Sequence, residues 1–188
     1  MATLLMDRGQ RIELLELLKR GDSEAWEDLV QQYQVPLSRY LYNMVKDKEL
    51  ARELTQDTFL EAYQAMHRIE GDLYLKAWLY RIATNNAIQV LRRRKLISWL
   101  PWTGGTISSE QTAGDYDDRL AQRELIRATL MRIPEKYRAV LLLHDEQGFK
   151  CEEIGTMLKI SLDAAKKRLT RAREMFQDAY EKLEWGGE

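Results

Sequence analysis

Two clusters of positively charged side chains are the residues of this chain best suited to hold a ligand. One is Arg92-Arg93-Arg94-Lys95, and the other follows a later helical pattern as Lys166, Lys167, Arg168, Arg171 and Arg173. Cations at a helix C-terminus are favoured by the helix dipole, but four in succession exceed what a helix end requires. Phosphate is the natural partner of that excess charge, so each cluster is either a nucleic-acid contact or a solvated helix surface.

No grouping of residues points to catalysis. The two histidines, His67 and His144, are far apart in the sequence, and no glycine-rich phosphate loop is present. With Cys151 as its one cysteine, the chain cannot form an internal disulfide, and a zinc site is not expected either. We therefore expect a binding protein that uses no metal and no cofactor, and that is not an enzyme.

The overall charge is nearly balanced, with 29 basic and 30 acidic residues among 188 and a formal charge of −1. Positive charge is therefore local, which is typical of a protein with one surface for nucleic acid and another for a protein. Residues 1–11 lack the apolar core of a signal peptide, and no apolar run approaches the roughly 20 residues that span a membrane. We expect a cytoplasmic protein without membrane insertion.

Hydrophobic periodicity predicts an all-α fold, because apolar residues recur at steps of three and four and no long β-branched alternation occurs. Asp22 or Ser23 is expected to cap the second helix of the chain, and Pro36 is expected to interrupt and kink it. The helices expected in the first domain, residues 1–95, are 12–19, 23–44, 47–67 and 77–95.

Two of these helices carry a second stripe of residues beside their apolar face. On helix 77–95 the apolar face contains Trp78, and the strip expected to be exposed comprises Tyr80, Arg81, Thr84, Asn85 and Ile88. On helix 47–67 the second stripe comprises Glu49, Glu53, Gln56, Asp57, Leu60 and Gln64. This acidic, amide-rich stripe is either a solvated face or the binding site of a partner.

Residues 96–118 lack periodicity and contain Pro101 and the pair Gly104-Gly105, which predicts a flexible linker between two domains. The opening of the linker, Ile97–Trp102, is unusually apolar. It either packs back on a domain or docks in a channel of a partner.

The second domain, residues 119–188, is expected to end in a helix-turn-helix without a wing. A short helix, Cys151–Leu158, and a long basic helix, Leu162–Leu183, are separated by a three-residue turn in which Ser161 is the expected N-cap. Gly155 is small where the two helices would cross. Expected helices at 119–132 and 134–144 complete a four-helix domain. The alternative is an ordinary helical hairpin with a charged exposed face.

Five motifs in order make the chain resemble a bacterial RNA polymerase sigma factor of the extracytoplasmic-function (ECF) group of the sigma-70 family. They begin with Gly21-Asp22, Ala25-Trp26 and Leu29-Val30, and continue with Glu53–Leu60 and with Ala77–Ala83 together with Asn85. The last two are Ile133–Val140 and Arg168–Glu174. The sequence departs from the family pattern with Lys159 where glycine is common in the turn and with Gly155 where alanine is usual.

The resemblance implies three sets of binding residues. The set expected to bind the beta-prime clamp of the polymerase is Glu53, Gln56, Asp57 and Leu60. The set expected to bind the −10 element is Tyr74, Tyr80, Asn85, Arg92, Arg93 and Arg94, together with the loop 68–74. The set expected to bind the −35 element is Ser161, Lys166, Lys167, Arg168, Arg171 and Arg173.

The resemblance also implies the partners: core RNA polymerase through its beta-prime and beta subunits, promoter DNA, and an anti-sigma factor. The implied function is promoter recognition and transcription initiation. One alternative is a stand-alone helix-turn-helix regulator that does not bind core polymerase. The other is a helical adaptor that binds proteins but not DNA, in which both basic clusters would be solvated.

Overall fold

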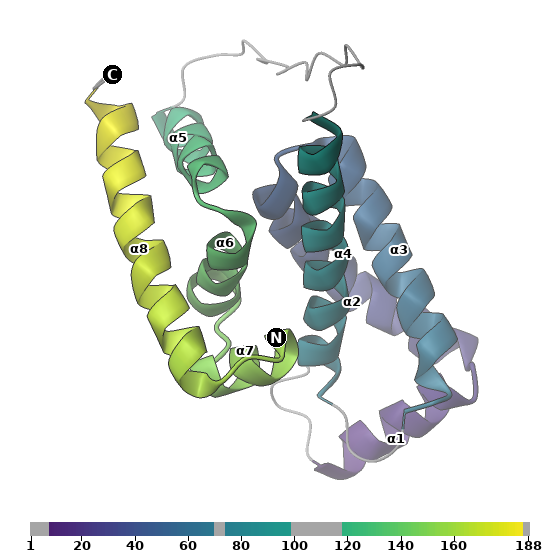
Figure 1. The fold of residues 1–188 in the computed structure, drawn as a ribbon. Helices are drawn as coiled ribbons and strands as arrows, with labels where there is room; N and C mark the ends of the chain where they lie inside the picture. Colours follow the sequence, from purple (N-terminus) through teal and green to yellow (C-terminus); the bar gives the residue numbers. More distant parts are fainter. Residues whose placement is uncertain (1–7, 70–73, 99–117, 186–188) are drawn as a thin grey trace. The chain divides into compact units, whose positions relative to one another are not determined.

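The computed structural model describes residues 8–69, 74–98 and 118–185. Every regular element in these ranges is helical, as expected from the sequence (Figure 1). The chain divides into two compact units, one of residues 1–42 with 47–86 and one of residues 43–46 with 87–188. No helix within the described ranges combines the length and apolarity that crossing a bilayer requires. The apolar stretch Trp99–Trp102 lies outside the described residues.

The N-terminal helices are α1 (Arg8–Lys19), α2 (Ser23–Val45), α3 (Lys48–Met66) and α4 (Leu75–Ser98). Gly21 has a φ of 75°, and the backbone N–H of Asp22 donates to the carbonyl oxygen of Leu17, so α1 ends in a left-handed turn. The carboxylate of Asp22 then accepts from the N–H of Ala25 at 2.9 Å and caps α2. Of the two expected caps, Asp22 is therefore the one used.

The prediction that Pro36 interrupts the second helix is wrong, because α2 continues through it from Ser23 to Val45. Pro36 is exposed, whereas Leu37, Tyr40 and Leu41 on the following turns are completely buried. A proline removes one backbone hydrogen bond from a helix, but burial of the following residues favours continuation.

The helix α3 begins and ends close to the predicted limits. Asp47 is its N-cap and accepts from the N–H of Leu50 at 3.0 Å, and His67 is its C-cap. Helical periodicity accounts for the burial of Leu50, Ala51, Leu54, Thr58 and Ala62, and the structure buries Thr55 and Met66 as well.

The C-terminal helices are α5 (Asp118–Arg132), α6 (Glu135–Leu141), the π-helical turn η2 (Leu142–Glu146), α7 (Cys151–Leu158) and α8 (Leu162–Glu184). The helix expected up to His144 thus changes to π-helical geometry at Leu142. The long helix α8 packs against α5, α6 and α7 (Figure 1). The core of this group includes Leu130, Val140, Leu143, Phe149, Ile154 and Leu169.

The helix-turn-helix prediction is confirmed in detail. The hydroxyl of Ser161 accepts from the N–H of Ala164 at 3.1 Å and caps α8. A Cβ atom added to Gly155 would lie 3.0 Å from the carbonyl oxygen of Ile160, so the turn passes closer to α7 than a larger residue would comfortably allow. Lys159 ends α7 in the left-handed conformation, with φ of 53°. The turn therefore has the geometry that glycine usually provides, but with a lysine in place.

Replacing Lys159 by glycine should stabilise the second unit, because a residue with a Cβ is strained in the left-handed region. After allowing for the greater freedom of glycine in the unfolded chain, we expect the free energy of unfolding to rise by about 0.5–1 kcal/mol. Chemical denaturation followed by circular dichroism measures the change.

The matched control is Gly148→Ala. Gly148 has a φ of 77° and open space around the position of a Cβ, so its substitution tests the backbone alone. It should lower the free energy of unfolding by about 1 kcal/mol. Shifts of the same sign in the two variants would contradict the explanation.

Candidate functional site

The four residues predicted to bind polymerase form one exposed surface on α3. We call Glu53, Gln56, Asp57 and Leu60 the α3 ridge; all four are exposed, and the side chain of Leu60 is 56% exposed. Their spacing of three and four residues places them on one side of the helix, opposite the buried Leu54 and Thr58. The exposed Leu60 follows the two carboxylates and the amide along the helix, so the ridge combines charged, polar and apolar groups.

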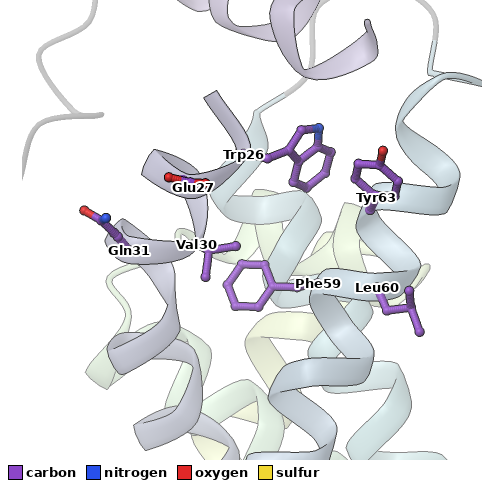
Figure 2. Close-up of a pocket in the computed structure, with 7 residues that line it drawn as sticks. All are labelled: Trp26, Glu27, Val30, Gln31, Phe59, Leu60 and Tyr63. Atoms are coloured by element: carbon purple, nitrogen blue, oxygen red, sulfur yellow. The ribbon is translucent and has the colours of Figure 1, made fainter. Parts of the chain in front are cut away.

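A shallow apolar groove, which the sequence reasoning missed, adjoins this ridge. It has a volume of about 530 Å³ and is lined by Trp26, Glu27, Val30 and Gln31 of α2 and by Phe59, Leu60 and Tyr63 of α3 (Figure 2). The indole of Trp26 donates to the carbonyl oxygen of Leu18 at 3.0 Å and meets the ring of Tyr63 edge to face at 5.0 Å. Phe59 and Tyr63, two aromatic residues outside the buried stripe of α3, were the feature of the sequence that could have indicated this groove.

The helix α4 presents only part of the strip that was expected to be exposed. Asn85, Arg92, Arg93 and Arg94 are exposed, and Tyr74 is half-buried just before the helix begins. Residues 70–73 of the loop that was expected to help hold a −10 base lie outside the described residues. The basic end of α4 is therefore accessible, as its prediction requires.

The prediction that Tyr80 is exposed and contacts the −10 element is wrong, because its side chain is completely buried. Its ring packs edge to face against Tyr40 at 5.2 Å between centroids, and the Tyr40 hydroxyl lies 2.7 Å from the hydroxyl of Thr84, also buried. A buried ring cannot offer a face on which a DNA base stacks. Tyr80 and Thr84 thus belong to the core of the first unit, as does Trp78, which is 5% exposed.

The helix α8 has the division of faces that a recognition helix needs. Ala165, Leu169 and Ala172 are buried, which directs the other positions outward. The side chains of Ser161, Lys166, Lys167, Arg171 and Arg173 are exposed, and that of Arg168 is half-buried. Arg171 donates to Glu174 of the same helix at 2.9 Å, an i,i+3 surface pair that leaves the guanidinium accessible.

Arg173 differs from the other cations of α8, because it pairs with a residue of another element. Its Nη2 and Nε donate to the two carboxylate oxygens of Asp145 in η2, at 2.5 and 3.1 Å. Nδ1 of His144 lies 2.6 Å from the same carboxylate. Burial raises the pKa of Asp145, but hydrogen bonds and positive charge from Arg173 and His144 outweigh it and hold the pKa below its ordinary value.

Acidic conditions should therefore weaken this contact. Because the pKa of Asp145 is lower in the folded chain than in the unfolded one, its contribution to stability is present above the ordinary carboxyl pKa and is lost as the pH falls through the lowered value. The pair was not predicted, since Asp145 and Arg173 are 28 residues apart and nothing in their spacing connects them.

No cluster of three or more histidine, cysteine, aspartate or glutamate side chains within the described ranges is placed to hold a metal ion. The geometry instead offers an acidic ridge with an apolar neighbour on one helix, a basic helix end, and a basic recognition helix. Surfaces of these kinds are suited to bind a protein and nucleic acid.

Both parts of the chain match family models of one class of transcription protein. Residues 21–97 match Sigma-70 region 2, and residues 123–176 match Sigma-70 region 4. The RNA polymerase sigma-H factor of Pseudomonas aeruginosa is 30% identical over 95% of this chain and 98% of that protein. The ECF RNA polymerase sigma factor SigW of Bacillus subtilis is 29% identical over 85% of this chain and 91% of that protein.

Two solved structures share the fold. One is CnrH in complex with the cytosolic domain of CnrY, with a TM-score of 0.67, 23% identity, and coverage of 89% of this chain and 94% of that one. The other is the sigma factor RpoE in complex with the anti-sigma factor NepR from Bartonella quintana, with a TM-score of 0.63 and 21% identity. It covers 81% of this chain and 96% of that one.

These matches define the protein first as a transcription initiation factor with two sigma regions, because one region model matches each part of the chain. The chain belongs to the extracytoplasmic-function group of the sigma-70 family. It is a sigma factor, a protein that binds core RNA polymerase and promoter DNA, and not a stand-alone regulator. The sigma factor family is non-enzymatic.

The correction at Tyr80 can be tested by its effect on stability. Tyr80→Ala should lower the free energy of unfolding by about 3–5 kcal/mol, because it removes a large buried ring and leaves a cavity beside Tyr40. The exposed Asn85→Ala serves as control and should change stability by less than about 0.5 kcal/mol. Thermal and urea unfolding measure both, and equal effects of the two substitutions would show that Tyr80 is not a core residue.

Proposed function

We propose that the α3 ridge is the surface through which this sigma factor binds the beta-prime clamp of core RNA polymerase. The observation that carries the proposal is the exposure of all four ridge residues on a helix whose opposite face is buried. Two carboxylates attract a basic partner, and Leu60 supplies an apolar contact at the edge of the groove. The apolar groove beside Leu60 distinguishes this surface from a purely charged helix face.

The helix α4 would hold the −10 element through Asn85 and the cations at its end. An opened DNA strand needs hydrogen bonds to the base edges and cations along the backbone. Asn85 provides an amide, and Arg92, Arg93 and Arg94 follow it along the same helix. Tyr74, which is half-buried, remains a candidate for stacking, whereas Tyr80 is withdrawn because it is buried.

The helix α8 would enter the major groove at the −35 element. Lys166, Lys167 and Arg168 lie on its first turns, which face the groove in helix-turn-helix proteins, and Ser161 caps it next to the DNA backbone. Lysines bind phosphate as point charges, whereas Arg171 has the planar fork suited to a guanine edge. Arg173 differs from the other cations carried over to α8, because Asp145 of another element engages its guanidinium.

The remaining parts of the proposal follow from the function. Residues 1–95 would act as the unit for the clamp and the −10 element, 96–118 as the linker, and 119–188 as the unit for the −35 element. A protein that acts on core polymerase works in the cytoplasm and draws the energy of strand opening from binding, not from catalysis of its own. The similarity to RpoE, described in complex with an anti-sigma factor, supports control by such a partner.

Reconstituted transcription tests the proposed function directly. Core RNA polymerase with this chain should produce discrete run-off transcripts from a genomic template, and core polymerase alone should not. The mapped start sites then identify the promoters served. Absence of transcripts that depend on the chain would reject the proposal.

Charge reversal on the α3 ridge should abolish binding to core polymerase. The double change Glu53→Arg and Asp57→Arg replaces two exposed carboxylates by cations, so attraction to a basic partner becomes repulsion. Affinity-tagged core polymerase should retain the wild-type chain at physiological salt but not this variant. The fold should be unaffected, because neither side chain is buried.

The matched control is the double change Glu24→Arg and Asp28→Arg, which alters two exposed acids with the same spacing on α2. This variant has the same net charge as the ridge variant. Core polymerase should retain this variant like the wild-type chain. If it does not, the effect of the ridge variant comes from net charge and not from a specific site.

Substitution of Arg171 by alanine should weaken promoter binding by about 1–3 kcal/mol if its fork reads a base of the −35 element. Filter binding of the holoenzyme to a mapped promoter and to a fragment with a scrambled −35 element measures the effect. Equal loss on both fragments, with a salt slope reduced by about 0.9, would make Arg171 a phosphate contact instead.

A further inference from the structure

We propose that Arg173 holds the recognition helix in position by pairing with Asp145 of η2, and that Arg173 does not contact promoter DNA. The inference rests on the proposed function of α8 at the −35 element. It assigns to Asp145, an acidic residue outside the helix-turn-helix, a role in positioning the side chains that bind DNA.

The geometry of the pair is that of a side-on fork. Nη2 of Arg173 reaches one carboxylate oxygen of Asp145 at 2.5 Å and Nε reaches the other at 3.1 Å. Two parallel charge-assisted hydrogen bonds restrict direction as well as distance, which a single contact does not. Nδ1 of His144 lies 2.6 Å from Asp145 Oδ1 and 3.3 Å from Arg173 Nη2, so the carboxylate is held from two sides.

Arg171 and Arg173 differ in where their acidic partners lie, and this difference distinguishes a residue that can bind DNA from one that positions the helix. Arg171 pairs with Glu174 on the same helix, so this contact moves with α8 and constrains nothing outside it. The partner of Arg173 lies on η2, before α7, so the contact ties α8 to a different part of the unit. An arginine whose fork is occupied in this way has fewer donors left for phosphate or base edges.

The position of Arg173 on the helix explains what the pair controls. At about 100° per residue, Lys166 and Arg173 lie about 100° and 80° from Ala165 around the axis, on the same side of α8. Fixing Arg173 against η2 therefore fixes the direction in which Lys166 projects two turns earlier. The direction of Lys167 follows, because both lysines belong to one rigid helix.

The ion pair adds to the restraint that the buried stripe of α8 places on rotation of this helix about its axis. Of the three buried residues, Ala165 and Ala172 are alanines and Leu169 has the longer side chain, while Leu162, Met175 and Phe176 are half-buried. Short side chains allow close approach of helices but give few interlocking contacts that would resist rotation about the axis. A directional ion pair at the edge of the stripe adds to that restraint.

The test uses holoenzyme made from core polymerase and the full chain. Its binding is measured on a promoter fragment mapped by run-off transcription and on the same fragment with a scrambled −35 element. Asp145→Asn removes the ion pair and also one negative charge. If Arg173 is a positioning residue, the variant should discriminate between the fragments about threefold to fivefold less well, with an unchanged salt slope.

Tighter DNA binding by the Asp145→Asn holoenzyme would overturn the inference. If Arg173 were a phosphate contact restrained by Asp145, Asp145→Asn would release it, tighten binding to both fragments and steepen the salt dependence. The control Glu152→Gln removes an exposed acid in the first turn of α7 and should leave discrimination unchanged. Thermal unfolding of each variant shows whether it is folded.

Arg173→Lys provides a second route should Asp145→Asn not fold. It keeps the positive charge but lacks the fork, so it should lose discrimination to the same extent as Asp145→Asn. Unchanged discrimination in Arg173→Lys would overturn the inference. The double variant should be no worse than either single variant, because both remove one interaction.

The proposed function and this inference fail in different ways. A wild-type holoenzyme that binds both fragments equally would remove the −35 role of α8 and the inference together. A wild-type holoenzyme that discriminates, combined with variants of Asp145 and Arg173 that discriminate equally well, would remove only the inference.

Discussion

Burial of one side of each functional helix is the constraint on which the surfaces of this protein depend. On α8 the buried residues are Ala165, Leu169 and Ala172, and their contact with the rest of the unit determines which cations remain outside. On α3 the buried series from Leu50 to Met66 does the same for the acidic ridge. Because side chains of a helix are fixed at about 100° to one another, burying one side leaves no choice about the other.

This constraint lets a chain of nearly neutral charge present an acidic surface and a basic surface at the same time. The carboxylates of the α3 ridge and the cations of α8 are on different helices in different parts of the sequence. At physiological salt the Debye length is about 8 Å, so the field of each surface is strongest for a partner in direct contact with it. A formal charge of −1 is therefore compatible with DNA binding, since the field that matters is local.

The backbone departs from regular helical geometry at two places near the helix-turn-helix, in the turn after α7 and in η2. The close approach at Gly155 places the turn against α7, and Lys159 accepts a left-handed conformation to complete it. The π-helical turn η2 adds a residue per turn just before α7 and carries Asp145 to the side of α8 where Arg173 lies.

The sequence alone determined the helices, most of their ends and the short helix, turn and long basic helix at the end of the second unit. Periodicity and caps such as Asp22 and Ser161 are local signals, which act within a few residues of the chain and can therefore be recognised in the sequence. The same periodicity predicted the ridge on α3, and the family resemblance implied that it binds the beta-prime clamp of the polymerase.

The tertiary structure decided which side chains are buried and which residues from different elements form pairs. Helical spacing places Tyr80 beside the apolar face, but only the neighbouring α2, with Tyr40, made that side of α4 interior. The groove requires side chains from two helices, and the pair of Arg173 with Asp145 requires two elements 28 residues apart. Burial and ion pairing depend on which elements meet, and that is a property of the whole fold, not of any stretch of the sequence.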